Sequence, residues 1–297
     1  MKFKSFLIFT LLMASWSVSR AGEIESNVPS LCEGLQKAFD KRHWGKTNPC
    51  STLDWKVGGT SVQGRPLIYY SFGSEDSKNT TLIFAMVHGD EITPLYLGFQ
   101  FVAWAQENMK SYPKSRLVIA PLVNPDGFFG YPKTRINAHG VDCNRNFATK
   151  DWTTQALQSW KNKFHSEKRR FPGSKPDSEP ETIFQKALID KVKPNKIISI
   201  HSPLNVLDYD GPDHLTLSDF NADYVKKCED LRTKIKATST GFFPGSLGNY
   251  AGQELGIPTI TLELPTADPD HAKEYWAHFK KGVETVITHE IPEKKKP

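Results

Sequence analysis

The chain is organised around one stretch, Thr80-Thr81-Leu82-Ile83-Phe84-Ala85-Met86-Val87-His88-Gly89-Asp90-Glu91. Its apolar, β-branched part predicts a buried parallel strand over residues 80–87, and Thr93-Pro94 beyond it is a helix start signal. His88 and Glu91 then lie on a tight turn at the carboxyl end of a central strand, where open α/β sheets bind their ligands. An imidazole and a carboxylate three residues apart can reach one cation, and these donors suit zinc. Taken alone, the pair is interpreted equally well as a polar surface turn.

Strand-like and helix-like segments alternate along the rest of the chain. Strands are expected at 53–62, 67–72, 116–120, 196–200 and 259–262, the first two as a hairpin. Helices are expected from Pro94, at 181–192, 218–237 and 250–255, and from Asp268 to about Ile287, whereas 149–180 is typical of a surface excursion. This alternation predicts an α/β fold of three layers, with a mixed, mostly parallel central sheet and helices on both faces.

The first 21 residues have the pattern of a secretory signal peptide. Lys2 and Lys4 precede an apolar core, and Ser19-Arg20-Ala21 places small residues around a cleavage site. The core is short for a membrane span, and no second one follows, so no stable membrane insertion is expected after cleavage. We expect an exported protein, periplasmic or secreted beyond, with one domain over residues 22–291 and a charged tail over 292–297.

Charge and cysteine content limit the function classes and the compartment. Removing residues 1–21 lowers the formal charge from +5 to +2, and no basic stripe interleaved with aromatic residues points to nucleic acid. Cys32 and Cys50 flank a short segment and could pair in an oxidising compartment, although two buried thiols are an equally good interpretation. Cys143 and Cys228 are isolated and are expected in the core.

Two further polar residues close predicted strands. His201 follows strand 196–200, and Glu263 follows strand 259–262, where a buried glutamate is costly unless it has a partner or a task. The carboxyl ends of parallel strands meet at one edge of a sheet, so these residues should converge on His88 and Glu91. That coincidence predicts a metal site.

The motifs between these residues resemble those of a known family. Asn124-Pro125-Asp126-Gly127 and Asp142-Cys143-Asn144-Arg145-Asn146 stand between the His-x-x-Glu pair and a later His-Ser, and Glu263 follows. The set and its order resemble the zinc carboxypeptidases of the carboxypeptidase A type, over nearly all of residues 22–291. The resemblance implies their fold, a peptide hydrolase activity and one bound zinc ion.

The resemblance also implies roles for individual residues. His88, Glu91 and His201 would be the zinc ligands, with the fourth position left to water. Glu263 would be the general base that takes a proton from that water and delivers it to the leaving amine. Arg135 would stabilise the oxyanion of the tetrahedral intermediate.

Three more residues match the family's recognition machinery. Asn144 and Arg145 would bind the terminal carboxylate of the substrate, and Asp142 would orient the first histidine ligand. One departure is the missing mobile tyrosine, because the matching stretch 239–246 contains none.

Several stretches resemble the murein peptide amidase branch of this family: 61–66, 171–176, 178–182, 201–204, 208–212, 244–248 and 256–265. That resemblance implies peptidoglycan peptides or muropeptide fragments as substrates, and hydrolysis of the γ-D-glutamyl–diaminopimelate amide. Asp208 or Asp210 would read the distal ammonium of diaminopimelate, unless the two only form a β-turn.

Three rival functions remain open from the sequence. An exported carboxypeptidase of broad specificity would act on ordinary peptides, with Leu247 favouring apolar ends. A wall-binding protein without catalysis would not need the intact ligands, Arg135 and Glu263. A small-molecule deacylase with His-x-x-Glu would not need the Asn-Arg-Asn motif.

Overall fold

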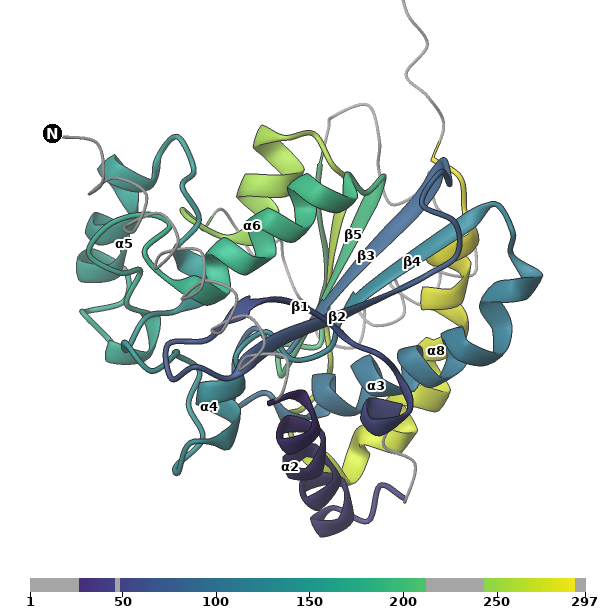
Figure 1. The fold of residues 1–297 in the computed structure, drawn as a ribbon. Coiled ribbons are helices and arrows are strands. Elements are labelled where there is room, and N and C mark those ends of the chain that lie inside the picture. The colour runs from purple at the N-terminus through teal and green to yellow at the C-terminus, as the bar shows by residue number, and fades with distance from the viewer. Residues whose placement is uncertain (1–26, 46–48, 212–242, 292–297) are drawn as a thin grey trace, which may run out of the picture.

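A mixed sheet of seven strands forms the middle layer of the computed structural model, which describes residues 27–45, 49–211 and 243–291 (Figure 1). The strand order is β1-β2-β4-β3-β5-β7-β6. The strands are β1 (Lys56–Thr60), β2 (Pro66–Phe72), β3 (Asn79–Ala85), β4 (Ser115–Ala120), β5 (Lys196–His201), β6 (Leu207–Asp210) and β7 (Thr259–Glu263).

The four inner strands β4, β3, β5 and β7 run parallel, and the outer pairs β1–β2, β2–β4 and β6–β7 are antiparallel. This confirms the predicted mixed, mostly parallel sheet and the hairpin before it. His201 pairs with Glu263 at the ends of β5 and β7. Two of the residues expected in the site therefore lie side by side at one edge.

Helices cover both faces of the sheet, as predicted (Figure 1). Helices α2 (Val28–Lys41), α3 (Ile92–Asn108) and α8 (Ala272–Thr288) pack on one face, and α6 (Pro180–Val192) with the π-helix η7 (Gly248–Glu254) packs on the other. The short helical segments are η1 (Pro49–Thr52), η2 (Met109–Ser111), α4 (Pro125–Phe129), η3 (Cys143–Arg145), η4 (Trp152–Ala156), α5 (Leu157–Asn162), η5 (Lys168–Arg170) and η8 (Pro269–His271).

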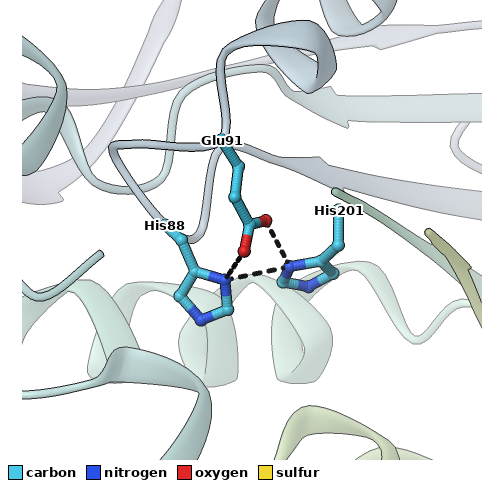
Figure 2. A group of neighbouring side chains, drawn as sticks. All are labelled: His88, Glu91 and His201. Atoms are coloured by element: carbon cyan, nitrogen blue, oxygen red, sulfur yellow. Dashed lines mark hydrogen bonds and ion pairs between the residues drawn. The ribbon is translucent and has the colours of Figure 1, made fainter. Parts of the chain in front are cut away.

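The strand that leads to the site ends earlier than predicted. β3 stops at Ala85, because Met86 has a φ of +56° and cannot continue an extended strand. Helix α3 starts at Ile92, two residues before the expected Pro94. The turn between them brings His88 and Glu91 toward His201 at the end of β5 (Figure 2).

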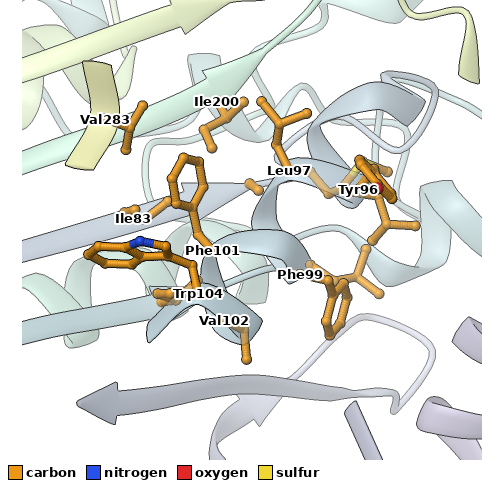
Figure 3. Close-up of a cluster of buried hydrophobic side chains, with 14 of the residues drawn as sticks. Ile83, Tyr96, Leu97, Phe99, Phe101, Val102, Trp104, Ile200 and Val283 are labelled. Carbon is orange, nitrogen blue, oxygen red and sulfur yellow. The ribbon is translucent and has the colours of Figure 1, made fainter. Parts of the chain in front are cut away.

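Helix α3 is buried around most of its circumference, as its sequence predicts. Figure 3 shows Phe101 facing Ile83 of β3 and Val283 of α8, and its ring centroid lies 4.7 Å from that of Trp276. Full burial of a phenylalanine side chain stabilises a fold by about 1.5–3 kcal/mol. The helix that begins directly after the predicted metal ligand Glu91 is therefore held on several sides.

Cys32 of α2 and Cys50 of η1 form a disulfide, which resolves the alternatives left by their spacing. Cys143 is a buried free thiol, as expected. No helix in the described part of the chain is long and apolar enough to cross a membrane. The predicted signal peptide, helix 218–237, Cys228 and the tail 292–297 lie outside the described residues.

Candidate functional site

The predicted metal ligands meet at the carboxyl ends of β3 and β5. Glu91 lies between the two imidazoles, with Oε1 2.6 Å from His88 Nδ1 and Oε2 2.9 Å from His201 Nδ1 (Figure 2). The two Nδ1 atoms are 3.1 Å apart. Among the described residues this is the one group of histidine, cysteine and acidic side chains able to hold a metal ion.

The donor set fits zinc. Tetrahedral zinc with ligands at 2.0–2.1 Å needs about 3.3 Å between donor atoms. The donor atoms of the three side chains lie 2.6–3.1 Å apart, so they must move apart by a few tenths of an ångström to hold the ion. Two nitrogens and one carboxylate also leave a fourth position for water or substrate, which is the ligand set of a catalytic rather than a structural zinc.

The outer nitrogens of both imidazoles have partners of their own. His88 Nε2 is 3.1 Å from Asp142 Oδ1, and His201 Nε2 is 2.9 Å from Ser199 Oγ. These contacts fix the ring orientations and leave both Nδ1 atoms directed at Glu91, the arrangement that metal-binding histidines need. Ser199 was not predicted, although its place two residues before His201 on β5 puts both side chains on one face of the strand.

Asp142 also binds the predicted oxyanion residue. Its Oδ2 accepts a hydrogen bond of 2.8 Å from Arg135 Nε, and Arg135 Nη1 lies 3.2 Å from Glu91 Oε1. Asp142 is fully buried, so these charge-assisted bonds work in a medium of low dielectric. The arginine is therefore held beside the metal cluster by two carboxylates.

Close backbone contacts fix the distance between the His88–Glu91 turn and the segments that lie beside it. A Cβ added at Gly89 would lie 2.2 Å from the carbonyl carbon of Gly127, and a Cβ at Gly127 would lie 2.7 Å from the carbonyl oxygen of Thr134. Only glycine tolerates such approaches. Three segments therefore pack directly against one another: the His88–Glu91 turn, the Asn-Pro-Asp-Gly turn and the loop segment that carries Arg135.

Burial and charge act in opposite directions on the acids of the site. Burial raises the pKa of Glu91, but the two imidazoles outweigh it and hold that pKa well below its usual range. Burial raises the pKa of Glu263, opposed by His201 and reinforced by the Glu91 carboxylate. Glu91 is therefore held as an anion suited to a cation, and Glu263 is shifted toward a group able to accept and release a proton.

A cavity of about 360 Å³ opens over the cluster and brings the remaining predicted residues together. It is lined by the metal-type residues His88 and Glu91 and, from the predicted set, by Arg135, Asn144, Arg145, Asp208, Asp210, Leu247 and Glu263. His201 and Asp142 lie just behind this lining, in contact with it. All the predicted site residues thus belong to one neighbourhood.

The Arg145 side chain is partly buried and incompletely paired. Its Nη1 donates to Asn144 O at 2.6 Å, and its Cζ lies 4.5 Å from the centroid of the Phe243 ring. Its buried Nε has no hydrogen-bond partner in the described structure. Because an unpaired buried donor is costly, this atom is a place where a ligand carboxylate would be stabilising.

Asp208 and Asp210 are two residues apart on β6, so their side chains lie on the same face of the sheet. Thr261 and Thr259 of β7 are their cross-strand neighbours. Gly248 makes room for Asp210, because a Cβ there would lie 1.9 Å from Asp210 Oδ2. Burial, followed by the charge of Asp208, raises the pKa of Asp210 to about 6. Two carboxylates therefore form an acidic wall of the cavity.

Sequence reasoning missed two cavity residues besides Ser199. Arg169 and Arg170 of η5 reach the cavity from the segment interpreted as a surface excursion. No motif marks them, because their position depends on tertiary hydrogen bonds between the segment that follows them and the Asp142–Asn146 loop. The expected helix at 250–255 is also present, but as the π-helix η7.

Comparison with known proteins adds a family relationship to this geometry. The model of the zinc carboxypeptidase family matches residues 45–296. The murein peptide amidase A of Escherichia coli K12 is 31% identical over 221 residues, which cover 73% of this chain and 83% of that protein. The murein peptide amidase A of Vibrio campbellii is 31% identical over 223 residues, covering 71% and 79%.

Solved structures give the same architecture. The murein-tripeptide amidase of Escherichia coli O157 superposes with a TM-score of 0.54 at 26% identity, covering 81% of this chain and 93% of that one. Carboxypeptidase A of Helicoverpa armigera superposes with a TM-score of 0.59 at 19% identity, covering 78% and 67%. The second likeness concerns the fold alone.

Proposed function

The chain belongs to the zinc carboxypeptidase family, and from that premise we propose that it hydrolyses the γ-D-glutamyl–diaminopimelate amide of peptidoglycan peptides. The family binds one zinc, and the His88, Glu91 and His201 cluster matches its ligand motif. The observation that carries the proposal is one cavity that combines this cluster, an incompletely paired guanidinium and an acidic wall.

The hydrolytic step uses residues that surround the cluster. Bound zinc supplies a Lewis acid for the scissile carbonyl and lowers the pKa of a water molecule. Glu263 accepts the proton of the attacking water on its carboxylate and returns it to the departing amine. Arg135, held by Asp142 and Glu91, offers its Nη2 to the developing oxyanion, since this nitrogen makes no hydrogen bond within the described residues.

The leaving residue is held at both of its ends. Its terminal carboxylate pairs with Arg145, whose Nε has no other partner in the described structure, while Asn144 stands beside it with Oδ1 accepting from Leu247 N at 2.8 Å. The distal ammonium of diaminopimelate pairs with Asp208 and Asp210. A ligand ammonium between these two acids would relieve their mutual repulsion. This favours a leaving residue that carries an amino group over one with an apolar side chain.

One observation favours a second candidate, a carboxypeptidase of broad specificity. Leu247 lines the same cavity, so a leaving residue with an apolar side chain could contact it. Such an enzyme would release phenylalanine from ordinary L-peptides faster than diaminopimelate from wall peptides.

Mass spectrometry of the products from L-Ala-γ-D-Glu-meso-diaminopimelate, with L-peptides ending in Phe or Lys for comparison, separates the two candidates. We expect diaminopimelate release by the zinc-loaded protein, and none after chelation or in a Glu263→Gln variant. Asp208→Ala and Asp210→Ala should each reduce the preference for diaminopimelate over phenylalanine. Asp76→Ala, on an exposed turn, is the matched control. Faster release of phenylalanine by the wild type would refute the proposal.

We also propose that the protein acts outside the cytoplasm. The Cys32–Cys50 disulfide supports this, because disulfides persist in oxidising compartments, and residues 1–21 carry a signal-peptide pattern. Cell fractionation with N-terminal sequencing tests it. A mature chain that begins at Gly22 in the periplasm or medium is expected, and an uncleaved cytoplasmic chain would contradict the proposal.

A further inference from the structure

Two arginines that belong to no recognised motif line the substrate cavity. Arg169 and Arg170 are the last residues of the short turn η5, and both face the space shared by Glu91, Arg145 and Glu263. The hydrolytic step proposed above assigns them no task. Their side chains nevertheless carry two of the positive charges that surround the reacting bond.

Each arginine is held in place by one acidic side chain. Arg169 Nη2 lies 3.0 Å from Asp90 Oδ2, and Asp90 is the neighbour of the ligand Glu91. Arg170 Nε is 2.9 Å from Glu167 Oε2, and its guanidinium lies over the Phe164 ring at 4.8 Å. Neither side chain forms a further hydrogen bond within the described part of the chain. Several N–H groups therefore remain to bind a ligand.

Charged side chains of both signs line the cavity. They are the arginines Arg135, Arg145, Arg169 and Arg170 and the acids Asp90, Glu91, Asp208, Asp210 and Glu263. Burial, with the charges of Arg135 and Arg170, lowers the pKa of Arg145 to about 10, against the opposing effect of Asp142. Arg170 is thus close enough to Arg145 for the two cations to repel, and a ligand with two carboxylates would relieve more of this repulsion than a ligand with one.

We propose that Arg169 and Arg170 form a second carboxylate site, separate from the pair Asn144 and Arg145. This inference rests on the proposed function, whose substrate carries two more carboxylates beside the terminal one. These are the α-carboxylate of the γ-linked D-glutamyl residue and the distal carboxylate of diaminopimelate. Guanidinium groups bind carboxylates through paired N–H donors, which a γ-linked acidic substrate offers and an ordinary apolar peptide lacks.

Three matched substrates separate the two sources. The reference is L-Ala-γ-D-Glu-meso-diaminopimelate. An isoglutaminyl analogue replaces the glutamyl α-carboxylate by an amide of the same size. An L-lysine analogue keeps the distal ammonium but lacks the distal carboxylate. Values of kcat/KM are measured for the zinc-loaded wild type and for each variant on all three.

The variants are Arg169→Gln, Arg170→Gln and their double, with Arg169→Lys and Arg170→Lys to restore the charge. Lys168→Gln is the matched control, because Lys168 is an exposed cation of the same turn that does not line the cavity. We expect the double variant to lose about 10- to 100-fold in kcat/KM on the reference substrate, the cost of a lost charge-assisted hydrogen bond. The lysine variants should recover part of that loss, and the control should lose nothing.

The pattern across substrates decides the outcome. If the loss disappears with the isoglutaminyl analogue, the arginines bind the glutamyl carboxylate; if it disappears with the lysine analogue, they bind the distal one. An equal loss on all three substrates, or the same loss in Lys168→Gln, overturns the inference while the proposed function stands. If the wild type hydrolyses none of the three substrates but cleaves ordinary peptides, both the proposed function and the second carboxylate site are refuted.

Discussion

Replacing Asp142 by asparagine tests how the site is held together. The fully buried carboxylate accepts from His88 at 3.1 Å and from Arg135 Nε at 2.8 Å, and its Oδ1 also accepts from Asn144 N at 3.0 Å. Asparagine has the same shape but only one accepting oxygen. Its amide group would face either the imidazole N–H or the guanidinium N–H, so one buried donor loses its partner.

Both stability and metal binding should respond. Breaking a buried charged pair costs about 3–5 kcal/mol, which sets the expected loss in the free energy of unfolding. Partners behind a metal-binding histidine are worth about 10- to 100-fold in metal affinity, or roughly 1.4–2.8 kcal/mol. The effect on kcat/KM should exceed the effect on zinc affinity, because Arg135 also loses the bond that orients it.

The assay combines chelator competition for zinc, urea unfolding and kcat/KM at saturating zinc. Asp126→Asn is the matched control, since Asp126 is a buried carboxylate whose oxygens accept from Ser61 at 2.8 Å and Arg65 at 2.5 Å rather than from any residue of the metal cluster. It should lower stability and leave zinc affinity unchanged. If Asp142→Asn binds zinc within twofold of the wild type, or if Asp126→Asn weakens zinc equally, the argument is refuted.

Three further outcomes are expected. Burial and the charge of Asp208 raise the pKa of Asp210 to about 6, so its carboxylate is charged above that pH and neutral below it. The ratio of kcat/KM for substrates ending in diaminopimelate to that for substrates ending in 2-aminopimelate, which lacks the distal amine, should therefore fall as the pH drops from 7 to 5. An equally steep pH dependence of this ratio in Asp210→Asn would exclude Asp210 as the cause. Reduction of the Cys32–Cys50 bond, whose cysteines are 18 residues apart, should lower the free energy of unfolding by about 3 kcal/mol in urea titrations, whereas a Cys32→Ser, Cys50→Ser protein should not respond to the reductant. Chelation of zinc should lower Tm reversibly, by a shift equivalent to about 4 kcal/mol when free zinc had stood at 1,000 times its Kd, and a Tm that is unaffected would mean that the cluster does not bind the metal.

The sheet and the metal cluster could be predicted because their signals are local. Apolar runs mark the inner strands, and His88, His201 and Glu263 each follow such a run, so parallel packing alone brings them to one edge. Ser199 was within reach of the same reasoning, since residues two apart on a strand share a face. Its hydroxyl simply carries no motif of its own.

Other features depend on tertiary structure that no local pattern encodes. Arg169 and Arg170 line the cavity because the chain that follows them is bonded to the Asp142–Asn146 loop, where Asp142 N donates to Phe171 O and Asn146 Nδ2 donates to Pro172 O. The early end of β3 follows from the left-handed conformation of Met86, a residue type that gives no warning of it. The pairing of Cys32 with Cys50 depends on how α2 lies against η1, which spacing cannot decide.

The acidic wall lies on β6, the last strand in the sheet order, which among the described residues pairs with β7 alone. His201 and Glu263, by contrast, lie on inner parallel strands with neighbours on both sides. Substitutions on β6 therefore disturb strand pairing on one side only, whereas substitutions at His201 or Glu263 affect strands paired on both sides. A laboratory lineage selected for a new leaving residue should therefore collect its first substitutions at Asp208 and Asp210.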